Sequence, residues 1–538
     1  MKNNYIYLIA GLLLFGMVSC TSEDDLVEDR IEATTPAPAE SPTFSAGTAD
    51  FSTYVSLGNS LTAGLMDAAL YTSGQESSFP NILAASFAQA GGGTFNQPDV
   101  GTENGFNTSA NNLEDIFVGC AFGKFILDTS IPGPIPTTPG DPLTFVTDPS
   151  SINNLGVPGM RLIELTVNGY GQLNPFYTRF ALDPTSTSVL EQAIAKQPTF
   201  MTMWLGNNDV LLWASGGGVG ADGNEDPTAD LLPSSLVSDA SFNATIDGAI
   251  AALLGNFPNM KIVMLNIPNV TVTPFFQAVA YNAIEIDGVT AAAATAGFDD
   301  YNAILDALGN PALGSLALSA EEIALRKISF SVGANPPVVV DDQLTDITAA
   351  VAALQALGAV TAEEAALLGP FAQARQLKSA TEDPALAAFG LGGELLTLSS
   401  GSVLGTLAVD TIPESVIGLG VPLDDSFTLT TDEITRLLTR ITTFNTKLAT
   451  VAATNDNIAL VDINTVITNA AINGGVVVDG LTLAPDFGPN GIYSTDGIHP
   501  NPRGYAIIAN EVMSVIETEF GATLPRADVL SFRSVIFQ

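Results

Sequence analysis

The chain contains a single histidine, His499, and Asp496 lies three residues before it. One turn of loop between them lets the Asp496 carboxylate accept a hydrogen bond from Nδ1 of the imidazole ring. That contact fixes the tautomer of the ring and leaves Nε2 available as a base. A pair of this kind activates a nucleophile, so the spacing predicts nucleophilic catalysis and calls for a third residue.

Ser60 is the candidate nucleophile. It follows the apolar run Tyr54–Leu57, in a segment that we predict to turn sharply from a strand into a helix. Open α/β sheets place their functional residues at the carboxyl ends of strands, and free amides at a helix N-terminus favour developing negative charge. A serine at such a turn can also serve only as a helix cap. We predict that Ser60, His499 and Asp496 form a catalytic triad.

Four segments together resemble the sequence blocks of the GDSL or SGNH family of serine hydrolases. In chain order they are Gly58-Asn59-Ser60-Leu61, Asn154-Leu155-Gly156-Val157-Pro158-Gly159, Gly206-Asn207-Asn208-Asp209 and Asp496-Gly497-Ile498-His499. The resemblance implies that Ser60 is the nucleophile of an ester hydrolase. It also implies an oxyanion hole formed by the Ser60 amide, the Gly159 amide and the Asn208 side chain. The blocks run from about residue 51 to 521, and the resemblance leaves out a long insertion.

One position departs from the family pattern. The residue before the family's serine is usually aspartate, and here it is Asn59. Asparagine keeps the shape and the hydrogen-bonding reach of aspartate but not its charge. The nucleophile and its base are unchanged, so we expect activity to be retained.

Continuous apolar runs predict the strands that must position these residues. Buried parallel strands have this pattern, and it occurs at 54–57, 200–205, 262–265 and 458–461. Helical patterns separate the runs, the clearest of them starting with a capping box at Thr430–Glu433, and another covers 502–520 after His499. This alternation predicts an α/β fold. The family resemblance narrows it to an SGNH-like three-layer α/β/α sandwich with a parallel sheet.

A large insertion divides the predicted core into residues 51–276 and 426–538. The intervening segment, 277–425, is rich in Ala, Leu and Gly and carries repeated helix-start signals, so we predict a helical insertion. It would act as an apolar lid or acyl-chain groove, or it would be a subdomain that only packs on the core. Ala/Leu-rich helices usually face each other, which favours the second interpretation.

The N-terminus resembles that of a bacterial lipoprotein. Lys2 precedes the apolar stretch Tyr5–Val18, and Cys20 stands where a lipobox places its acylated cysteine. We predict a signal peptide at 1–19, lipidation of Cys20 and a flexible acidic tether over 20–50. The alternative is a plain secretion signal with an incidental cysteine. The predicted location is the outer membrane, facing the periplasm or the cell surface, with the lipid anchor as the contact with the membrane.

Composition excludes several other classes of function. The chain has 17 Lys+Arg against 57 Asp+Glu and a net charge of −40, which excludes an ordinary nucleic-acid binder. An apolar content of 46% excludes wholesale disorder. We find no nucleotide-binding glycine loop and predict no cofactor and no metal. The acidic run 222–226 lacks the spacing of a calcium loop and is more typical of a solvated turn.

The sequence leaves three functions open. The first is hydrolysis of acyl or lipid esters through an acyl-enzyme intermediate, which the apolar insertion favours. The second is removal of acetyl groups from a carbohydrate. The third is a non-catalytic surface lipoprotein on a hydrolase scaffold. The complete set of Ser60, His499 and Asp496 argues against the third function, because a scaffold without activity has no need of this arrangement.

Overall fold

A computed structural model describes residues 43–105, 107–108, 121–127, 134–140, 144–409 and 415–534. The predictions of a signal peptide, of lipidation at Cys20 and of most of the tether lie outside these residues. The chain from Ser45 onward forms one compact unit. Among the helices of the described residues, none combines the length and the apolar character that crossing a membrane requires.

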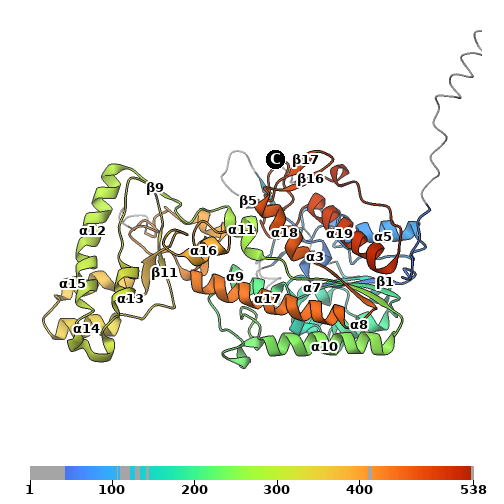
Figure 1. The fold of residues 1–538 in the computed structure, drawn as a ribbon, viewed down its shortest axis with the longest axis horizontal. Helices are drawn as coiled ribbons and strands as arrows, with labels where there is room; N and C mark the ends of the chain where they lie inside the picture. Colours follow the sequence, from blue (N-terminus) through green and yellow to red (C-terminus); the bar gives the residue numbers. More distant parts are fainter. Residues whose placement is uncertain are drawn as a thin grey trace, which may run out of the picture. The chain divides into compact units, whose positions relative to one another are not determined.

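A parallel sheet of five strands lies at the centre of this unit, in the order β15-β8-β7-β1-β6 (Figure 1). Gly58 at the end of β1 lies beside Gly156 of β6 and Trp204 of β7, so these strands end at the same edge. The predicted α/β class with a parallel sheet is confirmed. The strands are β1 (Tyr54–Gly58), β6 (Asn154–Gly156), β7 (Phe200–Trp204), β8 (Lys261–Leu265) and β15 (Ile458–Val461).

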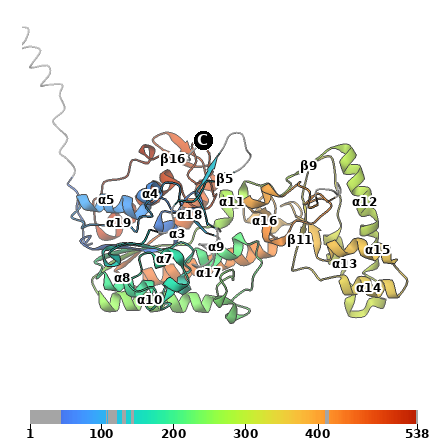
Figure 2. The same ribbon diagram turned by 180° about the vertical axis from the view of Figure 1, so that it is seen from behind.

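Helices cover both faces of this sheet (Figures 1 and 2). Side chains alternate along a strand, so Val55 and Leu57 belong to the hydrophobic core on one face, which α10 and α17 cover. Tyr54 belongs to the core on the other face, which α5 and α19 cover. The helices of these layers and their connections are α3 (Ser60–Ala63), α4 (Thr72–Glu76), α5 (Phe79–Gln89), α7 (Pro175–Thr178), α8 (Val189–Ala195), α9 (Asn208–Ser215), α10 (Asp239–Asn256), α11 (Pro274–Gln277), α17 (Thr431–Ala453), α18 (Ile463–Ile472) and α19 (Pro502–Phe520).

The helix α17 shows how the sequence sets these elements. The backbone N–H of Glu433 donates to the Thr430 hydroxyl, and the Glu433 carboxylate accepts the Thr430 N–H, which is the predicted capping box. The apolar residues that follow at helical spacing form its buried face, and the Phe444 ring stacks on Phe242 of α10. Those buried residues are Ile434, Leu437, Ile441, Phe444, Leu448 and Val451.

The segment 277–425 is mixed rather than purely helical. It has a hydrophobic core of its own, with Phe298, Leu305 and Leu354 among its members. Three antiparallel strand pairs, β9–β10, β11–β12 and β13–β14, accompany its helices. The elements are β9 (Ile284–Ile286), α12 (Gly288–Ala307), α13 (Ala320–Arg326), β10 (Gly333–Asn335), β11 (Val338–Val340), α14 (Thr348–Ala356), α15 (Ala362–Leu368), β12 (Ala374–Gln376), α16 (Pro384–Ala388) and β13 (Leu395–Leu396). The partner of β13, β14 (Thr428–Leu429), follows just after the segment.

Three further antiparallel pairs lie in connections of the core. The last of them follows α18 and precedes the segment that carries Asp496 and His499. The pairs are β2 (Asn107–Thr108) with β3 (Ala121–Phe122), β4 (Phe125–Leu127) with β5 (Pro134–Pro136), and β16 (Val476–Val478) with β17 (Leu481–Leu483).

Candidate active site

The ends of three neighbouring strands carry three of the predicted site residues. Ser60 is the first residue of α3, directly after β1. Asn208 is the first residue of α9, which follows β7 after a short turn. Gly159 lies in the loop after β6. The shared edge of these parallel strands therefore brings the three loops together, as open α/β sheets do for their functional sites.

Ser60, His499 and Asp496 form a continuous chain of hydrogen bonds. Nε2 of His499 lies 2.9 Å from Oγ of Ser60, and Nδ1 lies 2.9 Å from Oδ2 of Asp496. Ser60 is only 6% exposed. The carboxylate accepts a hydrogen bond from the N–H at Nδ1, and Nε2 is then free to accept a hydrogen bond from the Ser60 hydroxyl.

Backbone amides fix the Asp496 carboxylate. Its Oδ1 accepts the N–H groups of Ile498 and His499 at 2.9 and 2.8 Å, and its Oδ2 accepts the N–H of Ala68 at 2.8 Å. Burial acts to raise the pKa of Asp496, but the nearby His499 ring and these amides outweigh it and hold the pKa below its usual value. Asp496 is therefore ionised and held in one orientation.

A turn far away in the sequence supports this carboxylate, and the sequence analysis missed it. Asp67 and Ala68 both adopt left-handed backbone angles, with φ of 54° and 59°. This conformation is costly for residues with a side chain, so the surrounding contacts must stabilise it. The turn directs the Ala68 N–H at Asp496. No local sequence pattern predicts this contact, because 428 residues separate Ala68 from Asp496.

The Asp67 side chain binds the residue next to Asp496. Its Oδ1 accepts both the N–H and the hydroxyl of Thr495, at 3.0 and 2.9 Å, and its Oδ2 accepts the Tyr71 hydroxyl at 2.6 Å. The Asp67 N–H donates to the Ser494 hydroxyl. Burial raises the pKa of the Asp67 carboxyl, and the charge of Asp496 adds to that effect. Asp67 thus fixes the backbone from which Asp496 projects.

Asn59 caps the helix that begins with the nucleophile. Its side-chain oxygen accepts the N–H of Leu61 at 3.1 Å. Its Nδ2 is buried and has no hydrogen-bond partner. The cap uses only the oxygen, which aspartate also has, so Asn59 can perform this part of the role that the family gives to aspartate.

The oxyanion-hole candidates do not all line the same pocket. Nδ2 of Asn208 donates one N–H to the carbonyl of Met160 at 3.0 Å, which leaves its second N–H for another acceptor. Asn208 lines a pocket together with Ser60 and His499. Gly159 is not among the lining residues of that pocket, although it directly precedes Met160 and is exposed.

Asp209 holds the loop that follows Gly159. Its carboxylate accepts the N–H of Leu162 at 2.6 Å and that of Ile163 at 3.4 Å. The side chain is fully buried, and burial raises the pKa of Asp209 to about 7. The residue next to Asn208 therefore connects the start of α9 to the loop after β6.

The pocket beside Ser60 is largely apolar. It is open to solvent, and the space over it, including that solvent, is about 560 Å³. Among the described residues, none of 277–425 lines it, so the insertion contributes nothing to its walls in this structure. The lining residues are Asn59, Ser60, Leu61, Trp204, Asn207, Asn208, Leu211, Pro268, Val270, Thr273, Ile467, Tyr493, Ile498, His499, Pro500 and Ile508.

Comparisons of this chain with protein-family models, with curated proteins and with solved structures found no match. The chemistry of the site is therefore inferred from its own residues. They are a serine at the start of a helix, a histidine hydrogen-bonded to it, a carboxylate that orients the histidine, and a side-chain amide with one N–H not used by the Met160 carbonyl.

Proposed function

We propose that this protein is a serine hydrolase that cleaves ester bonds of acyl or lipid substrates. The observation that carries the proposal is the hydrogen-bond chain from Asp496 through His499 to Ser60, with both distances at 2.9 Å. This arrangement supplies a nucleophile, a base and a group that orients the base. It supports the resemblance to the GDSL or SGNH hydrolases, which remains part of the proposal.

The proposed reaction starts when Nε2 of His499 takes the proton of Ser60. The serine oxygen attacks the ester carbonyl carbon, and the electron pair of the C=O bond moves onto the carbonyl oxygen. When the C=O bond re-forms, the leaving alcohol departs with the proton that His499 returns. Water then attacks the acyl-serine by the same steps and releases the acid.

Negative charge on the carbonyl oxygen needs hydrogen-bond donors that are already in place. The N–H of Ser60 is a first-turn amide of α3, which has no acceptor within its own helix. The second N–H of Asn208 lies in the same pocket. We assign these two donors to the oxyanion hole. The Gly159 amide, which does not line this pocket, is added on the resemblance alone.

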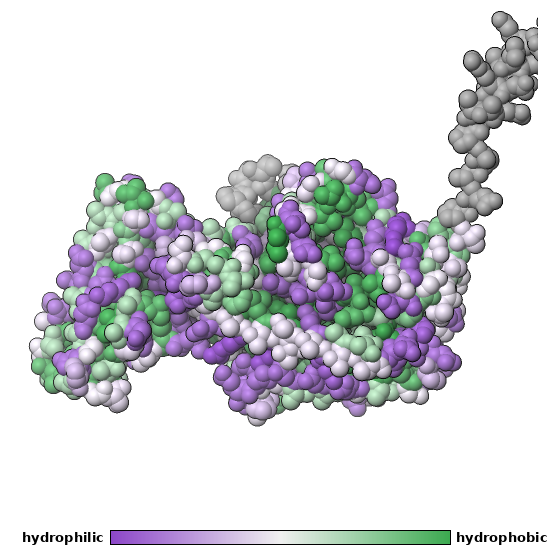
Figure 3. Space-filling view, in the orientation of Figure 1, coloured by the Kyte–Doolittle hydropathy of each residue, from purple (hydrophilic) through white to green (hydrophobic). Residues whose placement is uncertain are grey.

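The pocket favours an acyl chain over an acetylated sugar. Most of its lining is aliphatic or aromatic, whereas a sugar requires a row of polar partners. Apolar residues are also exposed on the neighbouring α18 and on the β16–β17 pair, where Ile472 is 75% and Val477 69% exposed (Figure 3). An acyl or lipid ester is therefore the first candidate, with removal of carbohydrate acetyl groups second.

The proposed setting is the outer membrane. It rests on the resemblance of the segment around Cys20 to a lipobox. Acylation of this cysteine would hold the hydrolase close to lipid substrates, and the acidic chain, with its net charge of −40, would otherwise be repelled by anionic membrane surfaces.

The test combines labelling with a series of substrates. A fluorophosphonate should label the chain once, at Ser60, and Ser60→Ala should abolish both labelling and turnover, by about 10⁴-fold or more. Esters with acyl chains of two to sixteen carbons should be cleaved faster than acetylated glycans. If the folded protein is not labelled and cleaves no ester, the proposal is wrong and the non-catalytic surface lipoprotein is favoured instead.

A further inference from the structure

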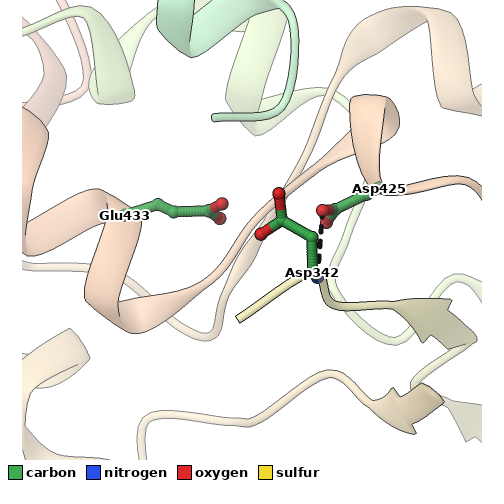
Figure 4. Close-up of side chains that lie close together, drawn as sticks. All are labelled: Asp342, Asp425 and Glu433. Atoms are coloured by element: carbon green, nitrogen blue, oxygen red, sulfur yellow. Dashed lines mark hydrogen bonds between the residues drawn. The ribbon is translucent and has the colours of Figure 1, made fainter. Parts of the chain in front are cut away.

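Three carboxylates converge at a place remote from the pocket (Figure 4). Asp342 lies between β11 and α14, Asp425 begins a short 3₁₀ helix (Asp425–Phe427), and Glu433 lies in the first turn of α17. One oxygen from each lies within 4.8 Å of one oxygen from each of the others. The carboxylates of Asp342 and Asp425 lie next to each other, and that of Glu433 points towards them.

Asp425 gives an independent indication that this cluster binds a ligand. The residue is 6% exposed, and its Oδ2 accepts the Asp342 N–H at 3.1 Å. Its Oδ1 is buried and has no hydrogen-bond partner. A buried carboxyl oxygen without a partner is costly, and native proteins pair such oxygens with donors or with metal ions.

The surroundings supply no protein cation to these oxygens. Among the described residues, no ion pair includes Asp342, Asp425 or Glu433. The buried Arg375 is bound instead by Asp341 and Glu394. Three carboxylates within one ion's reach thus lack a compensating charge.

The backbone after α9 packs against the same cluster. Gly217 and Gly218 both have φ of 72°. A Cβ on Gly218 would lie 2.5 Å from Oε1 of Glu433, and one on Gly217 would lie 2.3 Å from the carbonyl oxygen of Asp425. Two successive glycines therefore let the chain approach these acids more closely than any side chain would permit.

We propose that Asp342, Asp425 and Glu433 bind a calcium ion. Only oxygen ligands are present, which favours a hard cation over zinc. The upper limit of 4.8 Å on the distances between the three oxygens is within the reach of either Ca²⁺ or Mg²⁺. The flexible coordination of Ca²⁺ suits three carboxylates from separate segments better than the strict octahedron of Mg²⁺. Asp342 is exposed, so water completes the coordination from that side.

The ion joins the insertion to the core. Asp342 and Asp425 belong to the segment 277–425, whereas Glu433 belongs to α17, which packs against α10 and lies next to the sheet. Binding contributes stability according to the free calcium concentration relative to its Kd. This site is independent of the proposed hydrolase chemistry, so each proposal can fail without the other.

The experiment compares isosteric variants of the full chain after treatment with EDTA and dialysis. Titration calorimetry with CaCl₂ should show one site in the wild type and none in Asp425→Asn or Glu433→Gln. Both variants keep an acceptor oxygen for the hydrogen bonds seen at that side chain. Asp432→Asn, an exposed neighbour on the same helix, is the matched control and should bind like the wild type.

Thermal unfolding provides a second readout. Calcium at 100 times its Kd should raise the wild-type Tm by roughly 3 °C and leave Asp425→Asn unchanged. In EDTA, the Tm of Asp425→Asn should be higher than that of the wild type, because the variant has one fewer acid in the cluster to repel the others. Absence of a binding heat in the wild type, or equal binding by Asp425→Asn, would overturn the proposal. Equal Tm gains in all variants would overturn it too, because they would indicate screening of the acidic surface.

Discussion

Four donors hold the Asp496 carboxylate, and three of them are backbone N–H groups. Two of these amides belong to its own loop, and the third belongs to Ala68. The orientation of His499 therefore depends on a turn that binds this loop at Ser494, Thr495 and Asp496, and the Asp67 side chain makes the contact with Thr495. Because Asp67 does not line the pocket, we assign it a positioning role and not a catalytic one.

Substitution of Asp67 should lower kcat and leave KM nearly unchanged. Asp67→Ala leaves the buried Thr495 N–H without an acceptor and leaves the Thr495 hydroxyl only the Phe125 carbonyl, at 3.3 Å. An unpaired buried group costs about 1–3 kcal/mol. We expect kcat to fall by more than tenfold. Asp67→Asn keeps an acceptor oxygen and should retain most of the rate. Tyr71→Phe, which removes only the hydroxyl bound to Asp67, is the control. Wild-type kcat in Asp67→Ala would show that the turn does not position Asp496.

Two glycines in the turns at the strand ends, Gly159 and Gly206, differ in the space around them. Gly159 has φ of 79°, and the nearest atom to an added Cβ is 4.0 Å away. Gly206 has φ of 103°, and a Cβ there would lie 2.8 Å from the buried Ile267 and 2.9 Å from the Phe242 ring. The first position has space around it and the second has none. Only the first glycine is therefore free to serve the reaction without a packing role.

Alanine at each of these two glycines should separate catalysis from packing. Gly159→Ala should fold with a modest loss of stability, about 1–2 kcal/mol for the left-handed backbone. The variant keeps its backbone N–H, so its kcat should fall only as far as the added Cβ displaces that amide or obstructs the substrate carbonyl. Gly206→Ala should lose more stability. The measurements are Tm and kcat for esters. Normal turnover by Gly159→Ala would show that the added Cβ neither displaces this amide nor obstructs the substrate.

Sequence patterns predicted the elements that local chemistry determines. Four strands of the sheet were found as continuous apolar runs, and α17 from its capping box. The strand β6 was not predicted, because Leu155 is its one large apolar residue between Asn154 and Gly156. The pairs β9–β10 and β11–β12 were missed because each strand has only three residues. A run of three residues is too short to show the alternation of apolar and polar residues that identifies a strand.

Candidate site residues could be predicted only where short spacing, or the resemblance to the hydrolase sequence blocks, included them. Asp496 and His499 are three residues apart, so their contact follows from one turn of loop. The contact of Ala68 with Asp496 spans 428 residues, and the hydrogen bond from Asp342 to Asp425 spans 83. Such pairs depend on how whole elements pack. No local rule connects them, and the Asp342–Asp425–Glu433 cluster was therefore absent from the sequence analysis.

At the scale of the whole molecule, acidity is the dominant property. The net charge is −40, and most of the 57 acidic groups are ionised above pH 5, where their number changes little. A change of stability between pH 5 and 8 therefore reports the few acids whose pKa the fold raises. Asp209, fully buried with a pKa of about 7, is one of them in the core of the α/β unit.

The direction of this dependence follows from proton uptake. Below pH 3.8, the ordinary value for aspartate, both folded and unfolded chains hold the Asp209 proton, and the group has no effect. As pH rises from there to about 7, the unfolded chain loses the proton while the folded chain keeps it, so stability falls. Acids whose pKa the fold lowers, such as Asp496, act in the opposite sense, but only at a more acid pH.

We therefore expect the Tm of the EDTA-treated chain to fall as pH rises from 5 to 8 at constant ionic strength. Asp209→Asn should reduce that slope, because the carboxamide has no proton to lose and can still accept the Leu162 N–H. Asp432→Asn, at an exposed position, should keep the wild-type slope. Scanning calorimetry at four pH values is sufficient. Equal slopes in Asp209→Asn and the wild type would mean that Asp209 is ionised throughout, with the Leu162 and Ile163 amides able to support its buried charge.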